Sequence, residues 1–206
     1  MTVEEDKDIG VIVQANLKPA AQCATAARTA QAVLGQISCA FHYRDRHVFM
    51  KLYKQYVRPH LEFSTQAWAL WSVEDKKKLE NVQQRAVKMV SGLKAVDNEE
   101  KLKELGLLTL EERRVQADMQ MVLDPGAWFE PVGEQRAIRS SADPWNIKRK
   151  HGKLETRAKF FSIRVIDTWN ALPAYLKAIK NPEKFKAELK RLRATQMYLA
   201  YKRRHR

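Results

Sequence analysis

A helical repeat of apolar residues constrains the fold of this chain more than any other feature. Its clearest instance is a set of five apolar residues at intervals of 3, 4, 3 and 4: Leu79, Val82, Ala86, Met89 and Leu93. This spacing places all five on one face of an α-helix. Ser72 can cap the first turn, and Gly92 ends the helix. The pattern predicts an amphipathic helix that packs its apolar face into a core.

Most of the remaining chain carries similar helical signals. Asn98 begins a short helix that stops at Gly106, Thr109 opens a capping box, and Asn181 can cap a helix that starts with a proline. Pro59 kinks or ends the helix that contains it. We expect these further helices at residues 19–41, from Asp45, at 98–105, 109–123 and 157–170, and from Asn181.

Residues 9–13 (IGVIV) are the exception to this helical pattern. A short β-branched run of this kind predicts one buried strand. A single strand has no partner for its backbone, so it either docks alone or belongs to a sheet encoded upstream. This favours reading the chain as a fragment of a longer protein.

Turn-forming residues divide the chain into two helical parts. Residues 124–147 are rich in Pro, Gly, Ser and Asp and lack sustained periodicity. With 206 residues, 45% of them apolar, the chain can bury one sizeable core or two small ones. We therefore expect an all-α protein with one short β-strand. Its predicted parts are a strand segment at 1–16, a helical bundle at 17–123, a linker at 124–147 and a basic helical unit at 148–206.

The net charge of +14 lies almost entirely in the last part of the chain. From Lys148 onward there are 18 basic and 4 acidic residues, whereas the two kinds balance before it. Such an excess points to a polyanionic partner. For the clusters at 148–151 and 202–206, three interpretations stay open: contact with nucleic acid, a nuclear-import signal, or a solvated charge run. Aromatic residues that could pack or stack are interleaved with these cations: Phe160, Phe161, Trp169, Tyr175, Phe185, Tyr198 and Tyr201. For Trp169 the neighbouring apolar residues favour core packing.

Basic residues also gather on helix faces within the neutral part of the chain. Four of them share one face at spacings of 4, 3 and 4: His47, Lys51, Lys54 and Arg58. A second surface contains Lys78, Arg85 and Lys88, is diluted by Glu80, and is more typical of a solvated face than of a binding surface.

The chain shows no pattern typical of an enzyme on its own. It contains no Asp-Asp pair, no phosphate-binding loop of the Walker type, no His-Glu-x-x-His, no Gly-x-Ser-x-Gly and no Cys-x-x-Cys. The scattered histidines are His42, His47, His60, His151 and His205. We expect no catalytic residue, metal site or cofactor. Cys23 and Cys39 are predicted to be buried and not disulfide-bonded.

No segment has the composition of a membrane span or of a secretory signal. We therefore expect an intracellular protein, in the nucleus, the cytoplasm or both, that is not secreted and has no membrane partner.

Short motifs follow one another in a characteristic order along the chain: 8–11 (DIGV), 22–23 (QC), 44–45 (RD), 48–49 (VF), 52–54 (LYK), 57–63 (VRPHLEF), 66–68 (QAW), 79–89 (LENVQQRAVKM), 100–102 (EKL), 105–107 (LGL), 110–114 (LEERR), 160–162 (FFS), 164–165 (RV), 169–170 (WN) and 172–173 (LP). In this order they resemble the C-terminal part of a LINE-type (non-LTR, jockey-like superfamily) retrotransposon reverse transcriptase. The resemblance spans roughly residues 7–190.

The resemblance implies a structural role for each part. The strand at 1–16 would be a remnant of the edge of the palm, the bundle at 17–123 would be a thumb that holds the template-primer duplex, and a palm and fingers domain could lie upstream. Mg²⁺ would be needed only by an intact parent polymerase. The chain departs from the family at Gln14, Pro19 and 116–118 (QAD) and in its short loop at 124–143. These departures are typical of a degenerate or repurposed copy.

We therefore expect a non-catalytic fragment that grips RNA, an RNA–DNA duplex or DNA through its basic helix faces. Two alternatives stay open: a helical protein-interaction or structural protein with a basic localisation tail, and a decayed copy without function. The oligomeric state is not predicted. The candidate nucleic-acid-binding residues are His47, Lys51, Lys54, Arg58, Arg85, Lys88, Lys148, Arg149, Lys150, Arg157, Lys159, Arg164, Lys190, Arg191 and Arg193.

Overall fold

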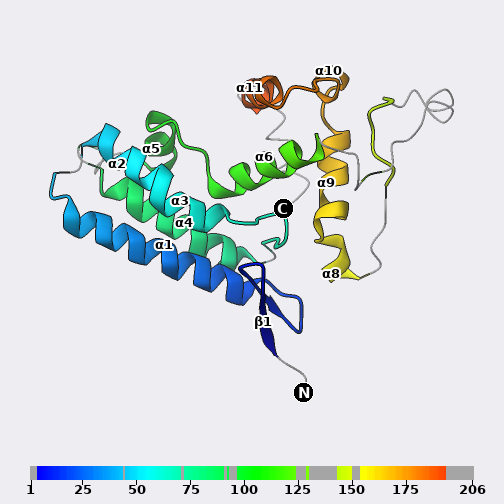
Figure 1. The fold of residues 1–206 in the computed structure, drawn as a ribbon. Coiled ribbons are helices and arrows are strands. Elements are labelled where there is room, and N and C mark those ends of the chain that lie inside the picture. Colours follow the sequence, from blue (N-terminus) through cyan, green and yellow to red (C-terminus); the bar gives the residue numbers. More distant parts are fainter. Residues whose placement is uncertain are drawn as a thin grey trace. The chain divides into compact units, whose positions relative to one another are not determined.

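The computed structural model (Figure 1) describes the chain in two units. The described residues are 4–43, 45–70, 72–90, 92, 97–123, 129, 143–149 and 154–193, with only the backbone described for Glu155 and Arg193. The units are Met1–Arg114 and Val115–Arg206. Most of the predicted linker, residues 124–128 and 130–142, lies outside the described residues, so its assignment stays a prediction.

The first unit begins with a two-stranded antiparallel hairpin rather than the single strand expected from the sequence. Strands β1 (Glu5–Asp8) and β2 (Val11–Gln14) pair with Asp8 opposite Val11. The turn between them has positive φ at Ile9 (44°) and Gly10 (83°), as a tight two-residue hairpin turn requires. The prediction of a single unpaired strand was wrong. Strand β1 is charged and exposed at all four positions, so it is held by backbone pairing and its sequence shows no apolar pattern.

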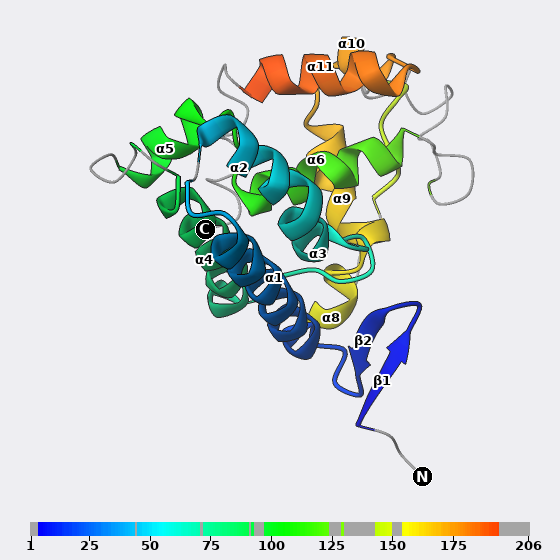
Figure 2. The ribbon, with the colours of Figure 1, turned by 60° about the vertical axis from the view of Figure 1, so that its left-hand side comes forward.

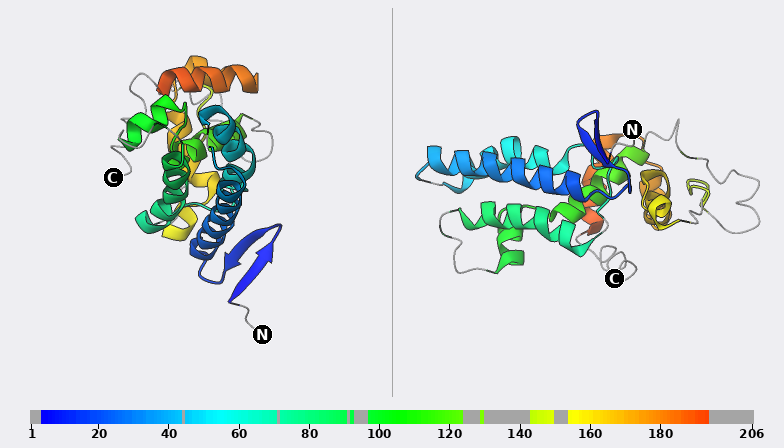
Figure 3. Two further views of the ribbon diagram at one scale, coloured as in Figure 1. Left: turned by 90° about the vertical axis from the view of Figure 1, so that its left-hand side faces the viewer. Right: turned by 90° about the horizontal axis from the view of Figure 1, so that it is seen from below.

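Among its described residues, the first unit contains six helical segments before residue 110. They are α1 (Ala20–Ala40), α2 (Arg46–Leu52), the π-helical turn η1 (Tyr53–Val57), α3 (Arg58–Glu62), α4 (Val73–Lys88) and α5 (Asn98–Glu104). As Figure 2 shows, α1 runs beside α4 and α3, and β2 lies at the N-terminal end of α1, which Figure 3 shows from two other sides. The Ala-rich sequence of α1 permits this close packing, with Ala26, Ala27 and Ala30 buried.

The predicted helix starts depend on side-chain caps that the structure contains. The Asp45 carboxylate accepts from the N–H groups of His47 (2.9 Å) and Val48 (3.1 Å), and Ser72 Oγ accepts from the N–H of Asp75 (3.0 Å). Each cap satisfies donors that have no partner within the helix. The beginnings of α2 and α4 are therefore encoded locally.

Pro59 changes the helix turn that precedes it. In a regular α-helix its ring would clash with the carbonyl of Gln55, to which it has no N–H to donate. The chain instead forms the wider η1 turn, in which the N–H of Arg58 bonds to the carbonyl of Tyr53 five residues earlier. Helical structure then continues through α3, so the proline alters the turn and does not end the helix.

Helix α6 (Leu110–Val122) starts with the predicted capping box and one cap from a distant helix. Glu112 N–H donates to Thr109 Oγ1 (3.2 Å), and Thr109 N–H donates to Glu112 Oε2 (2.9 Å). Glu80 in α4 accepts from the N–H groups of Leu110 (2.7 Å) and Glu111 (3.2 Å). Burial raises the pKa of Glu80, partly offset by these hydrogen bonds. This contact joins α4 to the start of α6.

The second unit has its own apolar core. Its described helices after α6 are α8 (Glu155–Ala158), α9 (Phe161–Asn170), α10 (Ala174–Lys177) and α11 (Pro182–Arg193). Val165, Ile166, Trp169, Leu176 and Phe185 pack together, with the rings of Trp169 and Phe185 6.0 Å apart. The predicted packing role of Trp169 is confirmed, since it is 5% exposed. The expected helix at 157–170 is instead divided between α8 and α9.

Two residues of α9 hold the segment at residues 143–149. Asn170 accepts from the N–H of Ile147 (2.8 Å) and donates to its carbonyl (2.9 Å). The indole N–H of Trp169 donates to the carbonyl of Trp145 (2.9 Å). These bonds satisfy backbone groups of residues 145 and 147, so the Trp169-Asn170 pair acts as a latch for this segment.

The described part of the chain is predominantly helical, which confirms the helical fold class; the likeness to a polymerase thumb stays a proposal. Cys23 is buried as expected, but the prediction for Cys39 was wrong, because it lies on an exposed face of α1. Both cysteines are free. Within the described residues, no helix combines the length and the apolar composition that crossing a membrane requires.

Candidate nucleic-acid interface

Three of the four predicted cations on the α2–η1 segment lie exposed on its surface. His47, Lys51 and Lys54 are exposed, whereas Phe49 and Tyr53 on the buried side reach the core with exposures of 2% and 0%. No described carboxylate lies within ion-pairing distance of these three side chains. The apolar side is anchored in the core, so the orientation of the basic side is fixed. We call His47, Lys51 and Lys54 the α2 basic face.

Arg58, the fourth cation, is withdrawn from this face. The η1 turn advances the chain by less rotation per residue than an α-helix, so Arg58 lies off the line that the spacing predicts. Its side chain is only 22% exposed, and its Nε lies 3.7 Å from Glu62 Oε1. The sequence analysis placed Arg58 in a continuous stripe because it assumed regular helical geometry.

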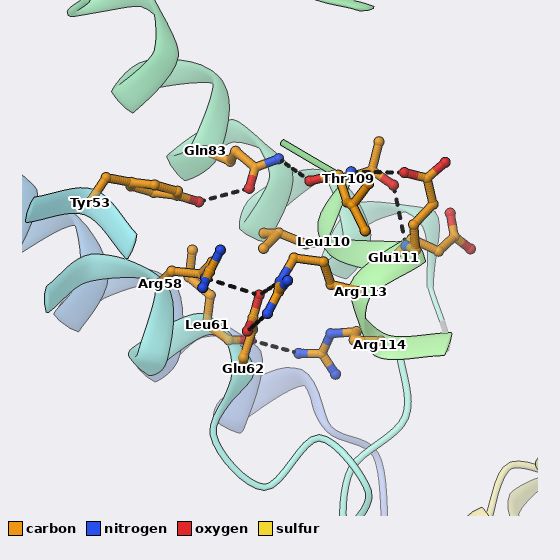
Figure 4. A network of polar contacts seen from close by, with 12 residues as sticks. Tyr53, Arg58, Leu61, Glu62, Gln83, Thr109, Leu110, Glu111, Arg113 and Arg114 are labelled. Carbon is orange, nitrogen blue, oxygen red and sulfur yellow. Dashed lines mark hydrogen bonds and ion pairs between the residues drawn. The ribbon is translucent and has the colours of Figure 1, made fainter. Parts of the chain in front are cut away.

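Glu62 is the centre of a contact between α3 and α6, which Figure 4 shows from close by. Arg113 binds both carboxylate oxygens of Glu62: its Nη2 lies 2.7 Å from Oε2, and its Nε donates to Oε1. Such two-point pairing fixes the plane of the guanidinium group. Arg58 approaches the same carboxylate from α3 itself. The two arginines are thus brought together around one acid.

The electrostatics of the two arginines differ. Burial lowers the pKa of Arg58, and the nearby charge of Arg113 lowers it further, whereas Glu62 only partly compensates. The hydrogen bonds that Arg113 donates to Glu62 raise the pKa of Arg113. Both side chains remain protonated at neutral pH because the ordinary pKa of arginine is so high. Arg113 is therefore well paired, while Arg58 is poorly compensated.

Arg114 has a structural position next to this cluster. It is 8% exposed, its Nη2 donates to the carbonyl of Leu61 (3.1 Å), and its guanidinium lies 3.9 Å from the centre of the Trp68 ring. The cation–π contact and the carbonyl bond attach α6 to the segment that follows α3. Arg114 thus helps to hold Arg113 in place.

A chain of buried hydrogen bonds links the η1 turn to α4 and to the segment before α6. Tyr53 Oη donates to Gln83 Oε1 (2.7 Å), and Gln83 Nε2 donates to the carbonyl of Leu108 (2.9 Å). Burial raises the pKa of the Tyr53 phenol, so it stays protonated as a donor. Residues from η1, α4 and the segment before α6 are linked in this way (Figure 4). These hydrogen bonds therefore hold η1, which carries Lys54 of the α2 basic face, in place.

The second predicted basic surface lies on α4. Arg85 and Lys88 are exposed there, whereas Lys78 pairs with Glu74 (3.1 Å) and Asp75 (3.6 Å). Glu80, which the sequence analysis expected to dilute this surface, instead binds the start of α6. Arg85 and Lys88 remain as exposed candidates.

In the second unit, some candidate residues form ion pairs, and the exposure of the others varies. Arg149 pairs with Asp167 at 3.1 Å across exposed side chains, and Arg191 pairs with Glu188 at 2.8 Å. Lys148, Arg157 and Lys190 are exposed, and Lys159 is half-buried. Lys150, the side chain of Arg193 and the cluster at 202–206 lie outside what the structure describes.

Arg164 has a different role from the one expected. Its Nη2 and Nε bind the two oxygens of Asp118 at 2.9 and 3.0 Å, and its Nη1 donates to the carbonyl of Lys159 (3.1 Å). Its side chain is 19% exposed. These contacts join α6 to α9 within the second unit, so Arg164 serves packing there.

The residue that the sequence analysis missed is Arg113. It belongs to the 110–114 motif, but nothing in its local sequence indicates that it pairs with an acid 51 residues away.

Comparison of the chain with protein-family models, with curated proteins and with solved structures finds no match. Among the described residues, no group of three or more His, Cys, Asp or Glu side chains could hold a metal ion.

Proposed function

We propose that this chain binds the sugar-phosphate backbone of RNA or of an RNA–DNA duplex and does not catalyse a reaction on its own. In this proposal it corresponds to the thumb and downstream region of a LINE-type reverse transcriptase. The observation that carries the proposal is the α2 basic face, in which three neighbouring basic residues lack a described acidic partner and stand on a helix anchored in the core.

Phosphate groups explain this arrangement better than a specific base sequence does. Lys side chains on a fixed helix can neutralise phosphates along a backbone, and a His side chain can donate a hydrogen bond to one, which positions a duplex without reading its bases. Arg85 and Lys88, and the excess of basic residues after Lys148, add attraction over a longer range. Binding should therefore depend strongly on salt and weakly on sequence.

Fluorescence anisotropy with a labelled RNA–DNA duplex tests this function. We expect the logarithm of the binding constant to fall linearly with the logarithm of salt concentration, by about 0.9 for each phosphate neutralised, as B-form DNA does. The double variant Lys51→Gln/Lys54→Gln should reduce the slope by about 2. A matched double variant, Lys18→Gln/Arg28→Gln, removes the same charge from exposed sites outside the α2 basic face and should change the slope much less.

A flat salt response of the unaltered protein would contradict nucleic-acid binding. It would favour the alternative in which the chain contacts other proteins and its basic tail serves localisation. Equal salt slopes for the two double variants would show that only the total positive charge of the chain matters for duplex binding. The α2 basic face would then not be a specific contact site.

A further inference from the structure

The cluster of Arg58, Glu62 and Arg113 contains more positive than negative charge. Arg113 takes up both oxygens of Glu62, with Nη2 2.7 Å from Oε2. Arg58 Nε stands 3.7 Å from Oε1, which is longer than a hydrogen bond. The single carboxylate is thus hydrogen-bonded to Arg113 and shared with Arg58 only at ion-pair distance, so one negative charge faces two positive ones.

The acids Glu80, Glu111 and Glu112 on α4 and α6 do not supply a second negative charge to the cluster. Glu111 pairs with Lys76, whose Nζ lies 2.7 Å from its Oε1. Glu80 accepts the N–H groups at the start of α6, and Glu112 caps Thr109. Each of these carboxylates is engaged by another group.

The cluster is accessible and at the same time partly desolvated. The side chains of Arg58 and Arg113 are 22% and 27% exposed. A partly buried guanidinium interacts with an anion more strongly than one in bulk water, because the local dielectric is lower. Its planar fork of donors also matches the oxygens of a phosphate. A phosphate is the anion that these donors fit within the proposed function.

We propose that Arg58 and Arg113 together receive one phosphate group of the bound backbone, and that Glu62 is the positioning residue that holds Arg113 for this contact. The inference rests on the proposed function and adds Arg113 and Glu62 to it. The η1 turn has a part in this site, since it turns Arg58 away from the α2 basic face and toward α6.

Salt titrations of duplex binding with the full chain test the subsite. The double variant Arg58→Gln/Arg113→Gln should reduce the salt slope by about 1, because it removes both charges that serve the one phosphate, and each single variant should reduce the slope by no more than that. Arg28→Gln is the matched control and should leave the slope nearly unchanged. An unaltered slope in the double variant, or a double variant that loses about 2, would overturn the proposal of one shared phosphate.

The variant Glu62→Gln tests whether Glu62 positions Arg113 or only adds a negative charge that opposes phosphate binding. Removal of a negative charge by itself would tighten the binding of a polyanion. If Glu62 holds Arg113 for the phosphate, the variant instead binds several-fold more weakly. Tighter binding would show that Glu62 acts only as a competing negative charge and would overturn its positioning role.

Two further measurements distinguish misfolding of a variant from failure of the proposed function. Arg58 makes no hydrogen bond to Glu62, so Arg58→Gln should melt within a few degrees of the unaltered protein even if Arg113→Gln does not. If the unaltered protein binds no duplex, the proposed function fails, and titration with inorganic phosphate then decides the subsite. NMR shifts of the Nε–H signals of both Arg58 and Arg113 would support it, and their absence would overturn it.

Discussion

Lys177 Nζ lies 2.8 Å from Asp143 Oδ2 in the interior of the second unit, where the lysine side chain is 1% exposed. The same ammonium group donates to Asn146 Oδ1 (2.6 Å) and to the carbonyl of Asn170 (3.3 Å). All three donors are therefore used. Together with the latch made by Trp169 and Asn170, this lysine fixes the segment from which Lys148 and Arg149 project.

Replacement of Lys177 by methionine should destabilise the second unit by about 3 kcal/mol. The variant keeps most of the side-chain volume but leaves Asp143 and two other acceptors without their donor. Chemical denaturation, followed by tryptophan fluorescence, measures the change. Lys180→Met, at an exposed position nearby in sequence, should alter the stability by less than about 0.5 kcal/mol. Similar losses in both variants would contradict the role of the buried lysine.

The stability of the second unit should fall in acid because of Asp143. Burial by itself raises the pKa of this carboxyl, but the hydrogen bonds from Lys177 and from the N–H of Trp145 outweigh burial and lower the pKa below its usual 3.8. A lowered pKa in the folded state stabilises the fold above the unfolded value, and this contribution is lost as the pH falls through the folded value. Asp143→Asn should flatten the pH dependence below about pH 4, as measured by denaturation at a series of pH values.

The Tyr53 hydroxyl should contribute measurably to the stability of the first unit. Tyr53→Phe leaves Gln83 Oε1 buried without its donor, which costs about 1–3 kcal/mol. Tyr56→Phe removes the same atom from a side chain that is 51% exposed and should have almost no effect. Thermal unfolding of the two variants compares them directly, and equal melting temperatures would refute the supporting role of the Tyr53–Gln83 bond.

The two cysteines should differ sharply in reactivity. Cys23 is fully buried, and burial raises the pKa of its thiol to about 12, so neither access nor thiolate is available. Cys39 is exposed. Under native conditions, mass spectrometry after treatment with iodoacetamide should find one alkylated site, at Cys39, and two after denaturation. Rapid native alkylation of Cys23 would show that α1 does not pack as described.

Ile9 should be replaceable with a gain in local stability. It is 87% exposed and adopts φ 44°, a conformation that β-branched residues avoid and that asparagine tolerates. Ile9→Asn should strengthen the hairpin by about 1 kcal/mol. Hydrogen exchange at the Val11 amide measures this effect, and slower exchange is expected. Faster exchange would indicate that the isoleucine side chain stabilises the turn by a contact of its own.

Local signals predicted most helices of this protein correctly. Asp45, Ser72, Thr109 and Asn181 each cap a helix that begins where the sequence analysis expected one. Such signals act within a few residues, so periodicity and cap chemistry are sufficient to find them. The hairpin could not be found in this way, because β1 is held by backbone pairing and shows no apolar alternation.

The candidate interface was predictable only in part. The spacing of His47, Lys51 and Lys54 correctly predicted an exposed basic face on a helix. The place of Arg58 was not predictable from that spacing, because the π turn before Pro59 changes the rotation of the chain. Arg164 matched the composition of a binding residue, yet its pairing with Asp118 gives it a packing role.

The sequence by itself determined the helical character of the chain, the starts of its helices, its charge distribution and the exposed α2 basic face, since all of these follow from the order and spacing of neighbouring residues. Only the tertiary structure decided which cations are paired and which are left uncompensated. Glu62 and Arg113 are 51 positions apart and meet because the fold of the first unit brings the first turn of α6 close to α3. An ion pair depends on distance in space, and that distance is set by the packing of helices rather than by position along the chain.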